Sequence, residues 1–330
     1  MQLSSKCLRL LKITIIALAL CVFINSMAIA QATKTTPHLR FIGASPGGTY
    51  YIVLGGIGEC VTRSLPGWQC TVEPGSSLSD VVRIAKGDGD LALVQGNLVL
   101  DQIKKGGDSS KLAALGAMGM SAAQFIVLSK TGLTSFDEFI QKKPKLRISW
   151  GPPSETHYIA AQRLFGEYGL KIEDFQKWGG KTLYKEMSDA ADMIASGGAD
   201  GCFLVALVPT APISELSLNH DLTLLSMNDE VVNNLVKKYN YIKVEIPPGT
   251  YNFVKKPITT FGAKSVMLVS SDMPEEVAYN VTMAIVENLD YLKSLHAMLK
   301  DIDVKSLAET GGVPLHPGAK RAYEEAGVTF

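Results

Sequence analysis

The chain has 330 residues, which is enough for two domains of ordinary size. Its 46% hydrophobic and 19% charged residues describe a globular protein with a sizeable core and exclude a disordered chain. Basic and acidic residues balance at 32 each, so the composition provides no basic surface for nucleic acid.

The first thirty residues have the three-part pattern of a secretory signal peptide. They contain three basic residues and no acidic one, then an apolar run at Ile13–Ile24 that is broken only by Thr14, then Ala28-Ile29-Ala30. The run is shorter than the roughly 20 residues that a membrane helix needs. We predict cleavage after Ala30 and export to the periplasm, which leaves 29 basic and 32 acidic residues and a net charge of −3.

The cysteines allow two hypotheses about export and cross-linking. A lipoprotein anchored at Cys21 is the alternative to cleavage, but the bulky Leu20 before it does not fit that pattern. Three cysteines remain after cleavage, and an oxidising compartment permits disulfides. We predict a bridge between Cys60 and Cys70, with free thiols as the alternative, and we interpret Cys202 as a small buried residue.

The mature chain begins with a strand, a glycine-rich loop and a helix. Leu39–Ile42 is apolar and β-prone, Gly43–Tyr51 is the loop, and the apolar positions from Ile52 onward have helical spacing. Unbonded N–H groups at such a helix start, together with the helix dipole, bind a carboxylate or phosphate. The alternative is a tight turn that needs glycine only for its backbone.

The same loop contains the Gly-x-Ser-x-Gly pattern of a hydrolase nucleophile elbow, at Gly43, Ser45 and Gly47. In that elbow the backbone N–H of the residue after the serine forms half of the oxyanion hole. Here that residue is Pro46, which has no N–H. A secreted hydrolase that uses Ser45 is therefore a minor alternative, and we expect no enzyme activity and no catalytic residue.

The strand, polar loop and helix pattern recurs along the chain. A helix begins near Ser77, the apolar strand 90–94 ends at Gln95-Gly96-Asn97, and the strand 146–150 leads through a loop to a helix at 157–168. The strand 201–206 is followed by Pro209-Thr210. This alternation predicts an α/β fold with a parallel sheet, in which ligands bind at the carboxyl ends of strands.

The order of the remaining elements predicts two lobes. Strands at 113–120 and 124–129 precede a helix at 135–142, and a strand at 263–270 precedes one long helix from Pro274. We expect connections near Leu128 and Val269, because the last residues would then return to the first lobe. The lobes would be 31–128 with 269–330, and 129–268. Two connections permit hinge closure.

Metal and cofactor motifs are missing from the sequence. The five histidines are scattered and none has the spacing of a metal site. No phosphate-binding loop or dinucleotide fingerprint occurs either. We expect no metal and no cofactor.

Several motifs, in their order along the chain, resemble the TAXI family of TRAP-transporter solute receptors. They are Pro46–Tyr51 with Gly55-Gly56, Gly75-Ser76-Ser77, Asp90–Gln95, Pro209-Thr210, Ile246–Tyr251, Ser271–Val277 and His316–Ala319. The resemblance implies a periplasmic, two-lobed binding protein of the type II class with its ligand cleft between the lobes. It also implies a small carboxylate ligand, such as glutamate or 2-oxoglutarate, that is delivered to an ion-coupled TRAP membrane permease. A receptor of an ABC-type importer is the alternative.

The loop Gly151–Thr156 departs from the usual pattern of that family, because it is shorter and carries Glu155. Glu155 either points to solvent at a helix start, where acids are favoured, or faces the cleft. In the cleft it would disfavour a dicarboxylate and pair with an ammonium group.

The polar loops predict a ligand site built from backbone N–H groups and neutral side chains, without arginine. The predicted ligand-binding residues are Ser45, Gly47, Gly48, Tyr50, Tyr51, Ser77, Gln95, Asn97, Ser154, Thr156 and Thr210.

Overall fold

The computed structural model describes residues 37–43, 48–153, 155–296 and 299–330. The predicted signal peptide, with its cleavage site, lies outside these residues. Within the described part of the chain, no helix combines the length and the apolar character that a membrane crossing needs.

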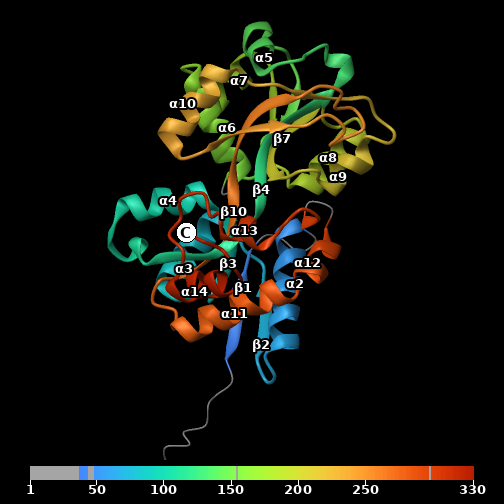
Figure 1. Cartoon of the computed structure of the whole chain (residues 1–330). Helices are drawn as coiled ribbons and strands as arrows, with labels where there is room; N and C mark the ends of the chain where they lie inside the picture. Colours follow the sequence, from blue (N-terminus) through green and yellow to red (C-terminus); the bar gives the residue numbers. More distant parts are fainter. Residues whose placement is uncertain (1–36, 44–47, 154, 297–298) are drawn as a thin grey trace, which may run out of the picture. The chain divides into compact units, whose positions relative to one another are not determined.

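A single mixed sheet forms the centre of the fold (Figure 1). Its strands are β1 (His38–Ile42), β2 (Gln69–Glu73), β3 (Leu91–Gln95), β4 (Leu112–Leu128), β5 (Arg147–Ser149), β6 (Lys181–Leu183), β7 (Gly201–Leu207), β8 (Leu222–Leu225), β9 (Ile242–Ile246) and β10 (Ile258–Ser270). The order is β2-β1-β3-β10-β4-β7-β5-β6, with β8 paired to β4 and β9 paired to β10.

The helices cover this sheet. They are α2 (Thr49–Ser64), α3 (Ser77–Lys86), α4 (Gly96–Lys105), α5 (Phe136–Lys142), α6 (Thr156–Glu167), α7 (Ile172–Lys177), α8 (Met187–Ala195), α9 (Ala211–Leu216), α10 (Asp229–Tyr239), α11 (Glu275–Glu287), α12 (Leu289–Leu295), α13 (Val304–Ala308) and α14 (Pro317–Glu325), with short 3₁₀ turns at Gly107–Ser110 and Ser129–Thr131.

The sheet is mixed, whereas the sequence predicted a parallel one. The pairs β1–β2, β1–β3, β5–β6 and β5–β7 are parallel as expected. The two longest strands, β4 and β10, run antiparallel to each other, and β10 is antiparallel to β3 while β4 is antiparallel to β7. These long strands are not linked to their neighbours by a crossover helix, so the parallel rule for strand-helix-strand units does not apply to them.

β4 and β10 link two separate hydrophobic cores. The buried residues of one pair of clusters lie at positions up to 118 and from 266 onward, and those of the other pair lie at positions 122 to 263. The chain therefore changes from one core to the other in the middle of both strands (Figure 1). The expected lobe limits at 128 and 269 fall at the ends of these strands and stay a prediction.

Close packing at this change of core requires glycine at one position. A Cβ on Gly262 of β10 would collide with the backbone oxygen of Ser121 on β4. Any larger residue there would separate the two strands at the point where they connect the cores.

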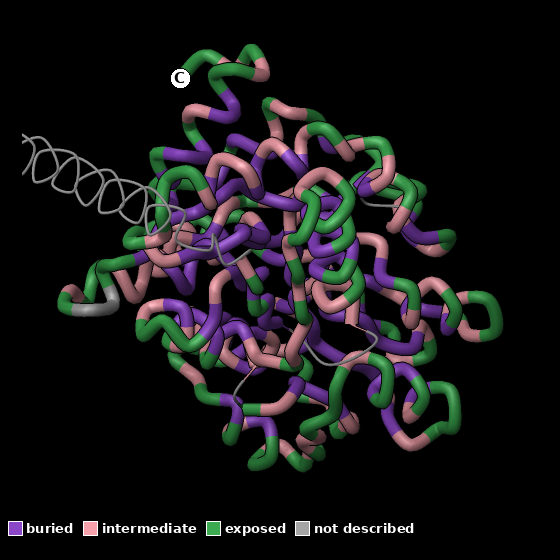
Figure 2. The backbone as a smooth tube through the Cα atoms, turned by 90° about the horizontal axis from the view of Figure 1, so that it is seen from below, coloured by how far each residue is buried: buried purple, intermediate pink, exposed green. Residues whose placement is uncertain are grey.

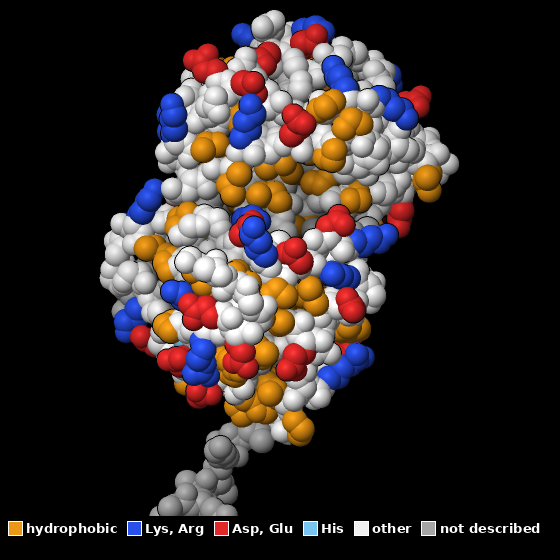
Figure 3. All heavy atoms as spheres, viewed as in Figure 1, with side chains coloured by type: hydrophobic (Ala, Val, Ile, Leu, Met, Phe, Trp, Pro, Cys, Tyr) orange, Lys and Arg blue, Asp and Glu red, His pale blue; other side chains and the backbone are white. Residues whose placement is uncertain are grey.

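The second core is rich in aromatic side chains. Trp150 and Phe125 are fully buried, with ring centroids 5.3 Å apart, and Phe203 packs on both. In the tube of Figure 2, buried segments run through the interior and exposed segments gather on the loops and outer helix faces. Charged side chains of both signs are interspersed on the face shown in Figure 3, in keeping with the balanced composition.

Two expectations about local structure were wrong. The strands predicted at 113–120 and 124–129 are one strand, β4, because the residues between them, Ser121-Ala122-Ala123, are buried inside the sheet. The long helix predicted from Pro274 is divided into α11 and α12 at Asn288. The Asn288 side chain donates to Ala284 O and to Ser64 Oγ, each at 2.8 Å, and so holds this break against α2.

The predicted disulfide is absent from the structure, because Cys60 and Cys70 are free thiols, as is Cys202. Cys60 belongs to the first core and Cys70 packs against it. Burial raises the pKa of both thiols to about 11, so they remain protonated at neutral pH. Both act as small apolar side chains in the packing between α2 and β2.

Candidate functional site

A cavity of about 340 Å³ lies where several strands end and several helices begin. This volume is at the lower end of the range for small-molecule sites, roughly 300–1,000 Å³. Its lining residues come from the starts of α2, α3, α6 and α8 and from the ends of β3 and β7. They are Gly48, Thr49, Tyr50, Ser77, Gln95, Glu155, Thr156, His157, Glu186, Met187, Ser188, Asp189, Val205, Ala206 and Leu207.

Five helices begin at this cavity because each of them follows a strand of the sheet. α2, α3 and α4 follow β1, β2 and β3, while α6 and α8 follow β5 and β6. Carboxyl ends of strands are where α/β sheets place ligands. The N-cap residues are Gly48, Ser76, Gln95, Glu155 and Glu186, and none of them makes a side-chain capping hydrogen bond. Backbone N–H groups therefore remain to bind a ligand anion.

His157 contributes a neutral imidazole to the lining. Its Nδ1 accepts a 2.9 Å hydrogen bond from the Val205 backbone N–H. Burial lowers the pKa of this histidine to about 4. Since Nδ1 is an acceptor, the proton of the neutral ring is on Nε2, which is left as a hydrogen-bond donor.

Three carboxylates line the cavity, two of them at the N-caps of α6 and α8. Burial, followed by the charges of Glu186 and Asp80, raises the pKa of Glu155 to about 7, although the Thr156 backbone N–H opposes this. Burial and then Asp189 raise the pKa of Glu186 as well. The cavity thus holds negative charge that the surrounding protein does not neutralise.

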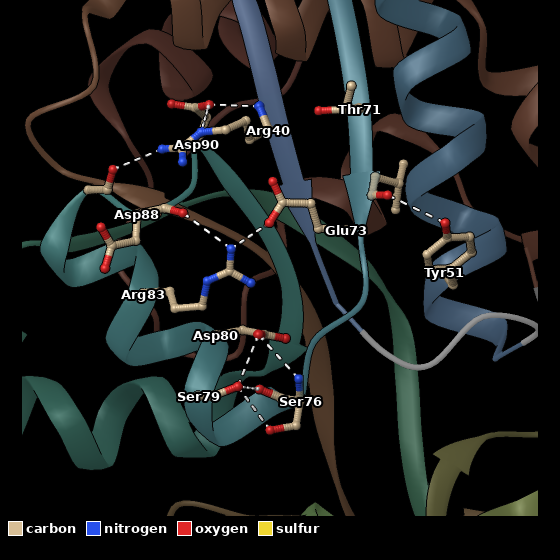
Figure 4. Close-up of polar contacts among 12 residues, drawn as sticks. Arg40, Tyr51, Thr71, Glu73, Ser76, Ser79, Asp80, Arg83, Asp88 and Asp90 are labelled. Atoms are coloured by element: carbon tan, nitrogen blue, oxygen red, sulfur yellow. Dashed lines mark hydrogen bonds and ion pairs between the residues drawn. The ribbon is translucent and has the colours of Figure 1, made fainter.

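A further carboxylate, Asp80, lies on α3 (Figure 4). It is fully buried, and its Oδ1 accepts hydrogen bonds of 3.2 Å from the Ser76 backbone N–H and from Ser79 Oγ. Its Oδ2 has no hydrogen-bond partner in the described part of the chain. Burial raises the pKa of Asp80 to about 6. A Cβ on Gly75 would collide with this carboxylate, so glycine is what lets the loop pass over it.

The cation nearest to Asp80 along α3 is engaged elsewhere. Arg83 donates to Glu73 Oε2 at 2.6 Å and to the Asp88 carbonyl at 3.4 Å (Figure 4). Three contacts lower the pKa of Asp80 against the effect of burial, and Arg83 contributes the least of the three. It therefore does not supply an ion-pair partner for the buried carboxylate.

Tyr50 connects the cavity to the two strands that link the cores. Its hydroxyl lies 2.8 Å from Ser121 Oγ on β4 and 2.6 Å from Ser265 Oγ on β10, and the two serine oxygens are 2.9 Å apart. Both serines are fully buried. The three hydroxyls form a closed ring of hydrogen bonds between α2 and the strands.

The structure brings together five of the predicted site residues: Gly48, Tyr50, Ser77, Gln95 and Thr156 all line the cavity. Three others lie outside its lining. The Tyr51 hydroxyl donates to Val72 O at 3.4 Å, Asn97 is buried on α4, and Thr210 is buried against the Tyr251 hydroxyl. Ser45, Gly47 and Ser154 fall outside the described residues, so the hydrolase alternative at Ser45 does too.

The sequence reasoning missed the residues that α8 contributes. Glu186, Ser188 and Asp189 stand at the start of this helix, and the pattern of polar residues before the apolar Ala190 could have marked them. The sequence pattern gives His157 no role, because no metal-ligand partner lies near it in the sequence. Its position directly after the polar loop 151–156 could have marked His157 as a candidate site residue. Among the described residues, no group of three His, Cys, Asp or Glu side chains is arranged to hold a metal ion.

A family model matches most of the chain. The model of the NMT1-like family matches residues 41–327. The chain belongs to the NMT1-like family. The match includes the cavity and both cores, so the site described above is part of the family domain.

Solved structures with similar folds give a second comparison. A protein from Bordetella bronchiseptica RB50 is 14% identical over 87% of this chain and 88% of its own, with a TM-score of 0.52. A TctC solute-binding protein from Polaromonas is 14% identical over 88% of this chain and 90% of its own, with a TM-score of 0.48. The alkanesulfonate-binding protein SsuA from Xanthomonas axonopodis pv. citri, bound to MOPS, is 16% identical over 88% and 84%, with a TM-score of 0.46. The predicted fold class, an α/β fold with two lobes, is confirmed by the helix-covered sheet, its two cores and the likeness to the Bordetella protein.

Proposed function

We propose that this chain is a periplasmic solute receptor that binds a small carboxylate and delivers it to an ion-coupled TRAP membrane permease. The observation that carries the proposal is the cavity itself, at which five helices start without a side-chain cap. Such N–H groups, together with the positive ends of the helix dipoles, favour a ligand carboxylate.

The resemblance to TAXI receptors supports the choice of transporter and the ligand class, an amino acid such as glutamate or an organic acid such as 2-oxoglutarate. Two of the resembling motifs provide cavity residues, Gly48 to Tyr50 from the first loop and Ser77 from the second. A third ends in Gln95, which is 2% exposed and forms the N-cap of α4. Three of the resembling motifs therefore contribute residues to this cavity.

The proposal rests on recognition and transport, with no catalytic step. Ligand capture would close the two lobes around the cavity, because the chain passes between the cores only along β4 and β10. A side-chain bridge already joins the lobes beside these strands. Arg163 of α6 donates to Asp101 of α4 at 2.7 Å, and Asn240 donates to the same carboxylate at 3.1 Å.

The transporter assignment is tested by reconstitution. The mature protein is added to proteoliposomes that contain the candidate permease, and uptake of a labelled solute is followed with a sodium gradient or with ATP as the energy source. The proposal predicts uptake that needs the receptor and the ion gradient but no ATP. Uptake that requires ATP would instead assign the chain to an ABC-type importer.

A further inference from the structure

The charge of the cavity lining is negative, with no counterbalancing cation. Glu155, Glu186 and Asp189 are acidic, and no lysine or arginine is present among the described lining residues. The neighbouring residues that the structure does not describe, 44–47 and 154, are uncharged in the sequence. His157 is neutral, because its Nδ1 accepts from Val205 and burial lowers its pKa to about 4.

A second and independent observation comes from Asp80. Its carboxylate is 0% exposed and Oδ2 has no partner in the described part of the chain. On α3 it lies three residues after Ser77, hence on the same helix face as a cavity-lining residue, and side chains tilt toward the N-terminus of their helix. Its charge contributes to the raised pKa of Glu155, which lines the cavity. An unpaired buried carboxylate beside an acidic cavity indicates a missing positive group.

Helix dipoles do not account for these acids. An acid at a helix N-cap is normally stabilised in its charged form, which lowers its pKa. The pKa values of Glu155 and Glu186 are instead raised, first by burial and then by nearby acids, which are Glu186 and Asp80 for Glu155 and Asp189 for Glu186. When these acids are ionised in the empty protein, their charges repel one another. A cationic ligand group would reduce this repulsion.

The charged and the uncharged residues of the cavity lining come from different elements. The residues from α2, α3 and β3, namely Gly48, Thr49, Tyr50, Ser77 and Gln95, are all uncharged. The lining carboxylates all come from the starts of α6 and α8. One side of the cavity thus provides neutral donors, and the other side provides negative charge.

We propose that the solute carries an ammonium group, held by Glu155 and Glu186, and at most one carboxylate, held by the N-termini of α2 and α4. This inference rests on the proposed receptor function and narrows its ligand class. It selects a zwitterion, such as a neutral or basic amino acid, over the dicarboxylates glutamate and 2-oxoglutarate. A second carboxylate would lie against the acids of α6 and α8.

The test is calorimetric titration of the mature protein at pH 8 with matched pairs of compounds. The probes are L-leucine, L-glutamine and L-arginine, each with its 2-oxo counterpart, and L-glutamate with 2-oxoglutarate. A hydrogen bond to a charged group is worth about 1.5–3 kcal/mol, so at least one of the three amino acids should bind about tenfold or more tighter than its 2-oxo counterpart. L-Glutamine should also bind more tightly than L-glutamate.

Isosteric variants assign the ammonium site to its residues. Glu155→Gln and Glu186→Gln should each weaken the amino acid about tenfold and leave any binding of the 2-oxo acid unchanged or stronger. Glu245→Gln is the matched control, because Glu245 is an exposed carboxylate on β9 outside the cavity lining. Thermal unfolding of each variant shows whether it is folded.

The outcomes separate this inference from the receptor function. If 2-oxo acids or dicarboxylates bind as tightly as the amino acids, or if Glu155→Gln strengthens amino-acid binding, the receptor function stands and the ammonium site is wrong. If no compound of either class binds, both proposals are overturned.

Discussion

The hydroxyl of Tyr50 lies 2.6 Å from Ser265 Oγ, and this contact joins the first turn of α2 to the middle of β10. Ser121 on β4 completes the ring of hydroxyls at the point where the chain changes from one hydrophobic core to the other. A residue that lines the cavity is thus bonded to both strands that connect the lobes.

Replacing Tyr50 with phenylalanine should destabilise the protein by about 1–2 kcal/mol. The ring stays packed, but two buried hydrogen bonds are lost, while the two serines can still bond to each other at 2.9 Å. Urea unfolding measures the change. Tyr51→Phe is the control, because its hydroxyl makes a single 3.4 Å bond to Val72 O, and we expect a loss below about 0.5 kcal/mol. Equal losses in the two variants would show that the hydroxyl ring does not matter.

Glu155 should make the stability of the empty protein depend on pH. Its pKa is about 7 in the folded protein and 4.5 as the ordinary value, so the stability it contributes is fully present below about pH 4.5 and is lost as pH rises through 7. The Glu155→Gln variant does not lose this stability, because glutamine stays uncharged as the pH rises. We expect the variant to gain about 1–3 kcal/mol over the parent at pH 8 and almost nothing at pH 4.5.

Unfolding by denaturant at the two pH values measures this difference, with Glu245→Gln as the control for loss of one exposed acid. A gain that is the same at both pH values would contradict the burial of Glu155 in an acidic cavity. A loss of stability at pH 8 would mean that the Glu155 carboxylate has a positive partner in the empty protein.

The three cysteines of the mature chain should react as thiols after unfolding. All three are free, with Cys60 and Cys202 buried. We expect alkylation in denaturant without reductant to label each of them, and we expect added reductant to shift the melting temperature by less than about 1 °C, since no bridge constrains the unfolded chain. Peptide mapping that recovers Cys60 linked to Cys70 would show that the exported protein is cross-linked after all.

Local patterns were sufficient to predict most elements of the fold. The strand predicted at Leu39–Ile42, the helix that contains Ile52 to Val61 and the helix after Ser135 are present, the last with Ser135 Oγ accepting from the Glu138 backbone N–H at 3.2 Å. Such signals depend on neighbours within one or two turns. The antiparallel direction of β4 and β10 could not be predicted in this way, because it follows from pairing between residues more than 100 positions apart, such as Ser121 and Ala263.

The site was predictable only in part for the same reason. Ser77 and Gln95 could be named because a polar residue at the end of a strand or the start of a helix is a local feature. Thr210 has the same local pattern, yet its side chain is buried against Tyr251, a residue 41 positions away. The acidic character of the cavity depends on Glu155 from α6 and on Glu186 and Asp189 from α8, which come together only in the folded chain.

The most direct test of a ligand site in this cavity is calorimetric titration of Gln95→Ala and Ser77→Ala with the tightest ligand from a screen of small acids and amino acids. Both side chains line the cavity, and each lost hydrogen bond to a charged ligand group costs about 1.5–3 kcal/mol. The account predicts that each variant binds roughly ten- to a hundredfold more weakly than the parent protein. Gln69→Ala, an exposed position on β2, should bind as the parent does. If Gln95→Ala and Ser77→Ala both bind as tightly as the parent, the ligand site is not in this cavity.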